Sequence, residues 1–281
     1  MSAEIYLHRA QEIIERIQGS QRMKIEAAAA KMAGVIASGG WCYLFGSGHS
    51  VIPVLDIFPR YGSYVGFYPL MDPRLMWFNV VGPGGATELL WLERQEGYIR
   101  NFLASVPMRK GECFLIFSHG GLNAAPVEAA VEARRRGLMV IGVASGRNQQ
   151  EAKAAHSSGK KLFDLCDIAI DNCVEPEDAQ VEITGLKMKV GAGSTLAAVA
   201  ISMALVSETA AQLAARGHSV EAFVSPNVRG FGADHNKRVF EEFRERKSES
   251  KVQSPRSKVQ SRKSKSPRSK VQRRRALSRD L

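Results

Sequence analysis

The apolar residues of the chain gather in five short runs, separated by longer stretches of mixed polarity. The runs are Trp41–Phe45, Tyr64–Leu70, Cys113–Phe117, Leu138–Val143 and Leu165–Ile170. A short, nearly continuous apolar run bounded by turn residues is typical of a strand that is buried on both faces. Such strands, alternating with helices, predict an α/β domain with a five-stranded parallel sheet covered on both faces.

The segments around these runs carry apolar residues at helical spacing. In Ala3–Ser38 the apolar residues recur every three or four positions, and Gly39-Gly40 ends the stretch, which Gly19-Ser20 is expected to divide in two. The late stretch Leu196–Ala215 carries almost no charge before Glu208, so it predicts a helix buried inside the domain or against a second subunit. Further helices are predicted at Val51–Tyr61, Thr87–Val106 with a bend near Gly97, Ala124–Arg136 and Gln149–Ser158.

Three polar loops follow predicted strands, at Gly46–Ser50, Ser118–Asn123 and Ala144–Gly146. The carboxyl ends of parallel strands meet at one edge of a sheet, and ligands bind there. Glycine turns that lead into helices direct backbone N–H groups at one point, which suits a phosphate. One Gly-Ser-Gly turn alone is also ordinary loop geometry. The convergence of three such loops is therefore the stronger sign of a binding site.

Charge is distributed unevenly along the chain. The net charge is +11, but Ser248–Leu281 holds 12 of the 39 basic residues and 2 of the 28 acidic residues. The remaining 27 basic and 26 acidic residues nearly cancel, so the body carries no general signature of nucleic-acid binding. With 44% hydrophobic residues it can bury the core of one domain. The composition divides the chain into a helical region at 1–40, a domain at 41–247 and a tail at 248–281.

The tail is rich in Ser, Lys and Arg, and SPRSKVQ occurs in it twice. It contains too few apolar residues to fold, so it is expected to be disordered. Its charge permits binding to nucleic acid or to an anionic membrane. A repetitive extension without a selected role is favoured instead, because no aromatic residue is present to stack on bases.

The N-terminus mixes acidic and basic residues, unlike a signal peptide, and no apolar run approaches the length needed to cross a bilayer. A cytoplasmic protein without a membrane segment is expected. The cysteines lack CxxC spacing. They are interpreted as small buried hydrophobes of a reducing compartment rather than as zinc ligands or disulfides: Cys42, Cys113, Cys166 and Cys173.

The turn GSGHS, the block FSHGGLNAAPVEAAVEARRRGLMVIGVAS and the helix start GAGST resemble the sugar isomerase (SIS) domain family, over about residues 3–246. The likeness is greatest to its single-domain branch, which includes sedoheptulose-7-phosphate isomerases and uncharacterised cytosolic SIS proteins. The resemblance implies a flavodoxin-like three-layer sandwich that binds a phosphorylated sugar. It also implies a homodimer or homotetramer in which subunits share sites.

The resemblance further implies which loop residues bind the substrate. The second loop departs from the usual Ser-x-Ser-Gly of the family, because Ser118 is followed by His119-Gly120-Gly121 and one hydroxyl is missing. Weaker or altered phosphate binding is expected. For His119, as for His49, a ligand contact and a structural role are both open. The binding residues carried over by position, with the two histidines, are Ser47, His49, Ser50, Ser118, His119, Gly121, Asn123 and Ser145.

Zinc-dependent heptose-phosphate isomerases of this family place a His and a Glu one turn apart on the first helix, where this chain has Ile52 and Asp56. Isoleucine cannot bind a metal, so neither zinc nor another cofactor is expected. Asp56 and Glu182 are the remaining candidates for acid–base catalysis of aldose–ketose isomerisation. For Asp56 an ion pair with Arg60, four residues later, is favoured over catalysis, whereas for Glu182 a structural salt bridge and a catalytic role are both open.

These observations lead to one main hypothesis, a phosphosugar-binding protein that acts as an isomerase or a related phosphosugar-metabolising enzyme. The alternative is a non-catalytic phosphosugar sensor or protein-interaction module, which the missing zinc ligands and the altered second loop favour.

Overall fold

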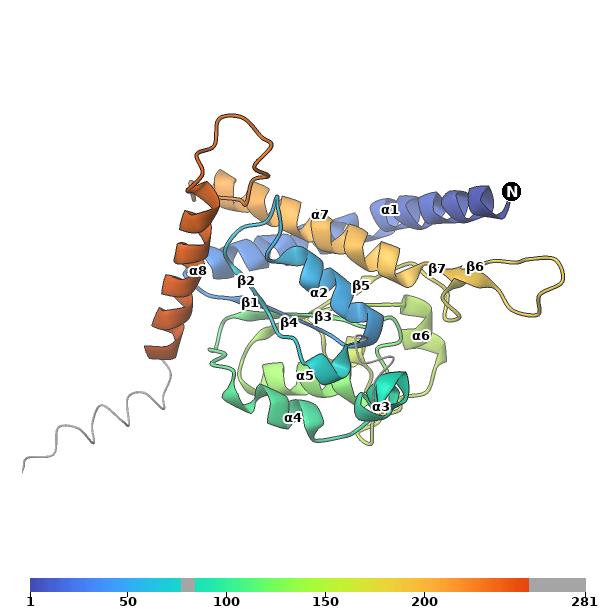
Figure 1. The fold of residues 1–281 in the computed structure, drawn as a ribbon. Coiled ribbons are helices and arrows are strands. Elements are labelled where there is room, and N and C mark those ends of the chain that lie inside the picture. Colours follow the sequence, from blue (N-terminus) through green and yellow to red (C-terminus); the bar gives the residue numbers. More distant parts are fainter. Residues whose placement is uncertain (77–83, 253–281) are drawn as a thin grey trace, which may run out of the picture.

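The computed structural model describes residues 1–76 and 84–252, and a parallel sheet forms its centre (Figure 1). The order of its five strands is β2-β1-β3-β4-β5. All pairings within this sheet are parallel, which confirms the prediction. The strands are β1 (Cys42–Gly46), β2 (Phe67–Pro69), β3 (Cys113–Phe117), β4 (Met139–Ala144) and β5 (Ile168–Asp171).

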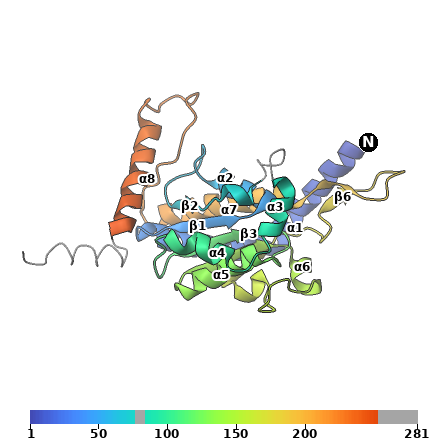
Figure 2. The ribbon, with the colours of Figure 1, turned by 60° about the horizontal axis from the view of Figure 1, so that its bottom comes forward.

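Helices cover both faces of the sheet, which gives the predicted three-layer, flavodoxin-like sandwich (Figure 2). One face carries α1 (Ser2–Ala37), α2 (Val51–Ile57) and α7 (Ser194–Ala215). The connection from β2 to β3 contains α3 (Gly85–Leu92) and α4 (Tyr98–Phe102). With α5 (Ala124–Arg135) and α6 (Gly146–Glu151), α4 covers the other face.

The sheet is dry because its central strands are apolar throughout. Every residue of β1 and β3 is buried. Tyr43 and Phe45 of β1 each make an edge-on ring contact with Phe114 of β3. Ile13 and Ile17 of α1 belong to the same hydrophobic cluster, so the N-terminal helix packs into the core of the domain.

Helix α1 is continuous, and the expected break at Gly19-Ser20 is wrong. The hydroxyl of Ser20 donates to the carbonyl oxygen of Arg16 inside the helix. The next side chain, Gln21, accepts a hydrogen bond from the backbone N–H of Asp171 at the end of β5. Packing against the sheet therefore keeps the helix continuous at a position where its sequence is a weak helix former.

Helix α7 packs along α1 and α2. An 18-residue stretch of this 22-residue helix has a mean hydropathy of 1.5, so by length and composition alone the helix is apolar enough to cross a membrane. The expectation that no apolar run has such a length is therefore not met. Ala197, Ile201 and Leu205 are fully buried on α7, which is the pattern of a core helix.

Several predicted helices are shorter than their sequence patterns suggested. Helix α2 ends at Ile57, because Pro59 cannot continue the backbone ladder. The stretch expected at Thr87–Val106 divides into α3, α4 and a 3₁₀ turn at Leu103–Ser105. After β5, the chain forms an antiparallel hairpin of β6 (Ala179–Val181) and β7 (Val190–Ala192). The hairpin lies beside the N-terminal half of α1, and Tyr6 of that helix donates to the carbonyl oxygen of Ala192 over 2.7 Å.

The last described helix, α8 (His235–Val252), extends beyond the boundary at Lys247 that composition predicted. The indole N–H of the fully buried Trp41 donates to the hydroxyl of Ser250 over 2.8 Å. Phe243 stacks against Phe58 and contacts Trp41 edge-on. These contacts attach Ser248–Val252 to the domain, and the remainder of the predicted tail lies outside the described residues.

Candidate functional site

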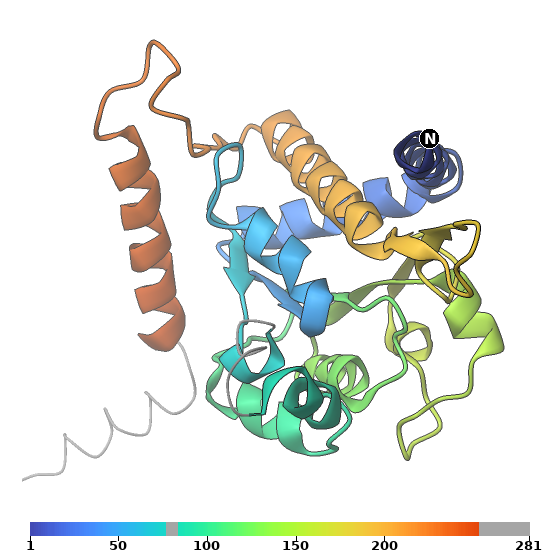
Figure 3. The same cartoon turned by 45° about the vertical axis from the view of Figure 1, so that its right-hand side comes forward.

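The connections of β1 and β3 define where the site lies. These neighbouring strands are in register, with Gly46 opposite Phe117, so Ser47 and Ser118 begin adjacent loops. From there the chain leads to α2 on one face and to α5 on the other, as the opposite positions of these helices in Figure 3 indicate. Such a divergence is the topological switch point at which open α/β sheets bind ligands.

A small cavity opens at this point, and we call it the switch-point cavity. It brings together side chains from the loops after β1, β3 and β5 and from the start of α7. Four of the predicted binding residues line it, although their role as ligands remains a prediction. The lining residues are His49, Ser50, Phe117, Ser118, His119, Val143, Asn172, Ser194, Thr195 and Ala198.

The ring of His119 has a defined orientation in this cavity. The backbone N–H of Val174 donates to Oδ1 of Asn172 over 3.0 Å, so the amide nitrogen of Asn172 faces the other way. That nitrogen lies 3.1 Å from Nδ1 of His119 and donates to it. In the neutral ring the proton is therefore on Nε2, which is buried and has no hydrogen-bond partner among the described residues.

Glycines shape both loops at this point. A side chain at Gly46 would lie 2.1 Å from the carbonyl oxygen of Ser50, so only glycine permits the tight turn after β1. Gly121 has φ of +65°, and its N–H donates to the hydroxyl of Ser118 over 3.0 Å. The position of Ser118 in the cavity thus depends on the left-handed backbone at Gly121.

Glu93, which directly follows α3, joins the first and second loops from outside the cavity lining. Its Oε2 accepts a hydrogen bond from Ser47 over 3.0 Å, and its Oε1 accepts one from Asn123 over 2.8 Å. Burial raises the pKa of this carboxyl, and the Ser47 contact opposes that rise. Ser47 and Asn123, both predicted to bind substrate, are therefore engaged by a carboxylate in this structure.

Carboxylates also occupy two helix N-termini at this edge. Asp178 accepts hydrogen bonds from the backbone N–H groups of Gly193 and Ser194 at the start of α7. Asp171 accepts one from Gly146 at the start of α6, over 2.7 Å. Because these N–H groups already face negative charge, a phosphate at this edge depends on hydroxyl, imidazole and loop donors.

The other predicted residues lie outside the cavity lining. Ser145 is buried and caps α6, where it accepts a hydrogen bond from Asn148 and donates to the carbonyl oxygen of Val174. Asp56, on α2, pairs with Arg60 one turn later. Its second oxygen is buried and has no hydrogen-bond partner among the described residues.

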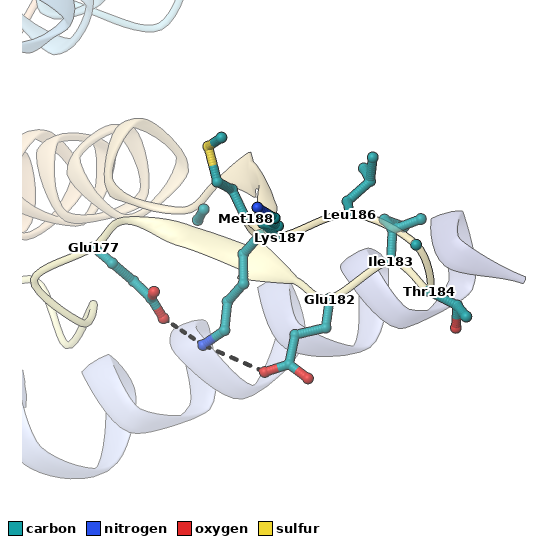
Figure 4. A pocket seen from close by; sticks show the side chains of 10 residues that line it. Glu177, Glu182, Ile183, Thr184, Leu186, Lys187 and Met188 are labelled. Carbon is teal, nitrogen blue, oxygen red and sulfur yellow. Dashed lines mark hydrogen bonds and ion pairs between the residues drawn. The ribbon is translucent and has the colours of Figure 1, made fainter.

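Glu182 follows β6 and is 85% exposed at its side chain. Lys189 lies between the carboxylates of Glu177 and Glu182. The surrounding hollow is wide, but it is lined only by the β6–β7 hairpin and by Glu177, two residues before it. Figure 4 shows the amine of Lys189 between Glu177 and Glu182, so the charged groups of this hollow are paired with one another.

Sequence reasoning missed Asn172, Ser194, Thr195 and Glu93 as site residues. The first three follow rules that the sequence already offered, because Asn172 ends a strand at the ligand edge and Ser194-Thr195 opens a helix there. Glu93 carries no such signal. It lies within a helical stretch, 46 residues from Ser47 in sequence.

The fold and the loops at the carboxyl edge agree with a match to a family model. The model described as "SIS domain" matches residues 5–145, which include β1, β3 and the loops after them. Sequence relatives support the same grouping over most of the chain. This chain belongs to the SIS domain family.

Its curated relatives are UPF0309 proteins. The one from Caldanaerobacter subterraneus subsp. tengcongensis is 33% identical over 86% of this chain and 98% of the relative. The one from Oceanobacillus iheyensis is 35% identical over 83% of this chain and 93% of the relative. A solved phosphoheptose isomerase from Francisella tularensis aligns with a TM-score of 0.47 and 14% identity, over 73% of this chain and 94% of that one.

Proposed function

We propose that this protein is a cytoplasmic phosphosugar-binding enzyme that isomerises a sugar phosphate. The observation that supports it most is the buried Nε2–H of His119, which has no hydrogen-bond partner among the described residues and lines a cavity with Ser50 and Ser118. A buried donor without a partner costs about 1–3 kcal/mol, and a phosphate oxygen offers the missing acceptor. His119 thereby replaces the hydroxyl that the second loop lacks.

The binding claim is tested by thermal denaturation of the full chain with fructose 6-phosphate, ribulose 5-phosphate and sedoheptulose 7-phosphate. The unphosphorylated sugars and inorganic phosphate are the controls. We expect at least one sugar phosphate to raise the melting temperature more than its parent sugar does, and Ser118→Ala to reduce that rise. If none of the three stabilises the protein at millimolar concentration, binding of this substrate class is contradicted.

A non-catalytic phosphosugar sensor is the second candidate. It is favoured by the positions of Asp56 and Glu182, since neither lines the switch-point cavity. A sensor binds the sugar phosphate and returns it unchanged, whereas an isomerase interconverts aldose and ketose. Incubation of the protein with a bound sugar phosphate, followed by separation of the isomers, distinguishes the two.

We also propose that the protein self-associates through α1 and α7. Ile14 is 45% exposed and Met23 is 76% exposed on α1. Ile14, with Ala200 and Ala204 of α7, lines a groove between the two helices. A second copy that covers this groove removes apolar surface from water. Light scattering coupled to size exclusion tests it, with Ile14→Glu expected to yield monomers.

A further inference from the structure

We propose that Glu93 is the acid–base catalyst of this site and moves a proton between two neighbouring carbons of the bound phosphosugar. The inference rests on the proposed function and adds a catalytic residue to it. Asp56 and Glu182, the candidates from sequence, lie on α2 and on the β6–β7 hairpin. Glu93 instead contacts the two loops that diverge at the switch point.

The carboxylate is held in a fixed position. Ser47 donates to one oxygen and Asn123 to the other, at 3.0 and 2.8 Å. The backbone carbonyl oxygen of Glu93 accepts a hydrogen bond from the N–H of Ala125, in the first turn of α5, over 2.9 Å. Contacts from both loops and from α5 restrict the side chain to one geometry, as proton transfer requires.

The environment suits a carboxyl group that both accepts and donates a proton. Burial raises its pKa, and the contacts with Ser47, Arg94 and Asn123 only partly oppose that rise. Within the described residues, Glu93 forms hydrogen bonds to neutral groups and no ion pair. By contrast, the buried Glu132 is paired with Arg135 and Arg136, which lower its pKa. A carboxyl group with a raised pKa exchanges protons more readily near neutral pH than an ion-paired one.

The hydrogen bonds of Glu93 also determine how a substrate is oriented. Ser47 and Asn123 already donate to the Glu93 carboxylate, which leaves Ser50, Ser118 and His119 of the switch-point cavity as the donors that a phosphate would meet. The cavity is small, so a sugar phosphate held there by its phosphate must place its carbon chain outside the cavity. The first and second loops, which begin beside the cavity, carry Ser47 and Asn123, and these residues hold Glu93. A sugar chain that leaves the cavity between these loops meets Glu93.

The proposed step needs no co-reactant. Ionised Glu93 removes the proton from the carbon next to the carbonyl group of the open-chain aldose. The C–H electron pair forms the C=C bond of an enediolate, and the carbonyl π pair moves to oxygen. A proton then passes from the neighbouring hydroxyl to that oxyanion. The new carbonyl forms, and Glu93 returns its proton to the former carbonyl carbon, so the ketose and the carboxylate remain.

The test uses the full chain in D₂O with the sugar phosphates that stabilise it. Nuclear magnetic resonance measures deuterium incorporation at the carbon next to the carbonyl, and calorimetry measures binding. Glu93→Gln is expected to bind within several-fold of wild type and to lose exchange by about 100-fold or more. Glu96→Gln is the matched control, since this exposed carboxylate nearby bonds to Ser157 and lies outside the site.

The outcomes separate the two proposals. If wild type binds no sugar phosphate, the proposed function fails. If wild type binds one without exchanging deuterium, or if Glu93→Gln exchanges as fast as wild type, the role of Glu93 is overturned while binding stands. Should Glu93→Gln fail to fold, Glu93→Asp retains the charge and withdraws the carboxylate. It is expected to keep binding with exchange slowed at least 10-fold, and wild-type exchange in that variant overturns the inference.

Discussion

Asn172 donates a hydrogen bond from Nδ2 to Nδ1 of His119 over 3.1 Å, which leaves the proton of the neutral ring on the nitrogen buried in the switch-point cavity. The orientation of Asn172 is itself set by the N–H of Val174. The two residues come from the loops after β5 and β3, on opposite sides of β4. The orientation of this buried donor thus depends on contacts across three strands of the sheet.

Removal of the imidazole is expected to weaken phosphosugar binding. His119→Ala deletes a hydrogen bond to a charged group, worth about 1.5–3 kcal/mol, so the dissociation constant should rise by about 10-fold or more. Asn172→Ala keeps the imidazole ring but removes the donor that fixes its tautomer, so a smaller rise in the dissociation constant is expected. Calorimetric titration measures both, with the exposed His8→Ala on α1 as the control. Equal affinities in His119→Ala and wild type contradict this role.

The second loop depends on its glycine. Gly121→Ala places a side chain at φ of +65°, 2.5 Å from Nε2 of Gln149, so either this amide, which bonds to Gly120, or the loop that holds Ser118 must shift. Strain of this kind costs about 1–3 kcal/mol. Thermal denaturation and titration should show lower stability together with weaker binding. Gly159→Ala, also at positive φ but with open space around it, is the control for backbone strain alone.

Glu93 should give stability a specific pH dependence. Burial raises its pKa above the ordinary value of 4.5, so the folded protein holds this proton more tightly than the unfolded chain does. Its contribution to stability is fully present below pH 4.5 and is lost as the pH rises through the raised pKa. The variant Glu93→Gln has no ionisable group at this position, so its stability does not fall in this way as the pH rises.

Urea unfolding of both proteins between about pH 4 and about pH 7 measures the difference. The stability of Glu93→Gln relative to wild type should increase with pH across that window. A difference that is independent of pH shows that the carboxyl group titrates alike in the folded and unfolded chains, which would contradict its burial.

The end of α8 should stabilise the domain. Ser250→Ala removes the acceptor of the buried Trp41 indole N–H and is expected to cost about 1–3 kcal/mol in the free energy of unfolding. Ser248→Ala is the matched control, because that exposed hydroxyl bonds only within its own helix. Equal urea midpoints for the two variants contradict a structural role for Ser248–Val252.

The sheet could be predicted because the apolar pattern that indicates each strand lies within the strand itself. Runs such as Cys113–Phe117 are apolar at every position, and β3 occupies that same range. The continuity of α1 was not predictable, because Gln21 contacts Asp171 of β5, 150 residues away in sequence. The extension of α8 likewise depends on Ser250 meeting Trp41.

The candidate site could be predicted only in part, because it also depends on contacts between residues far apart in the sequence. The rule that ligands bind at the carboxyl ends of strands brought His49, Ser50, Ser118 and His119 together. It also selected Ser47 and Asn123, whose partner Glu93 comes from a helix that carries no motif. Which donors face a ligand and which bond to the protein depends on tertiary contacts that sequence spacing does not encode.

The proposed binding of a phosphosugar by the Nε2–H of His119 in the switch-point cavity can be observed at the imidazole itself. Its most direct test is a long-range ¹H–¹⁵N spectrum of protein labelled at histidine, assigned with His119→Ala and recorded with and without a stabilising sugar phosphate. The free ring should carry its proton on Nε2, and the ligand should shift that resonance more than those of His8 or His218. A proton on Nδ1, or a His119 ring that does not respond to a bound sugar phosphate, would contradict the account.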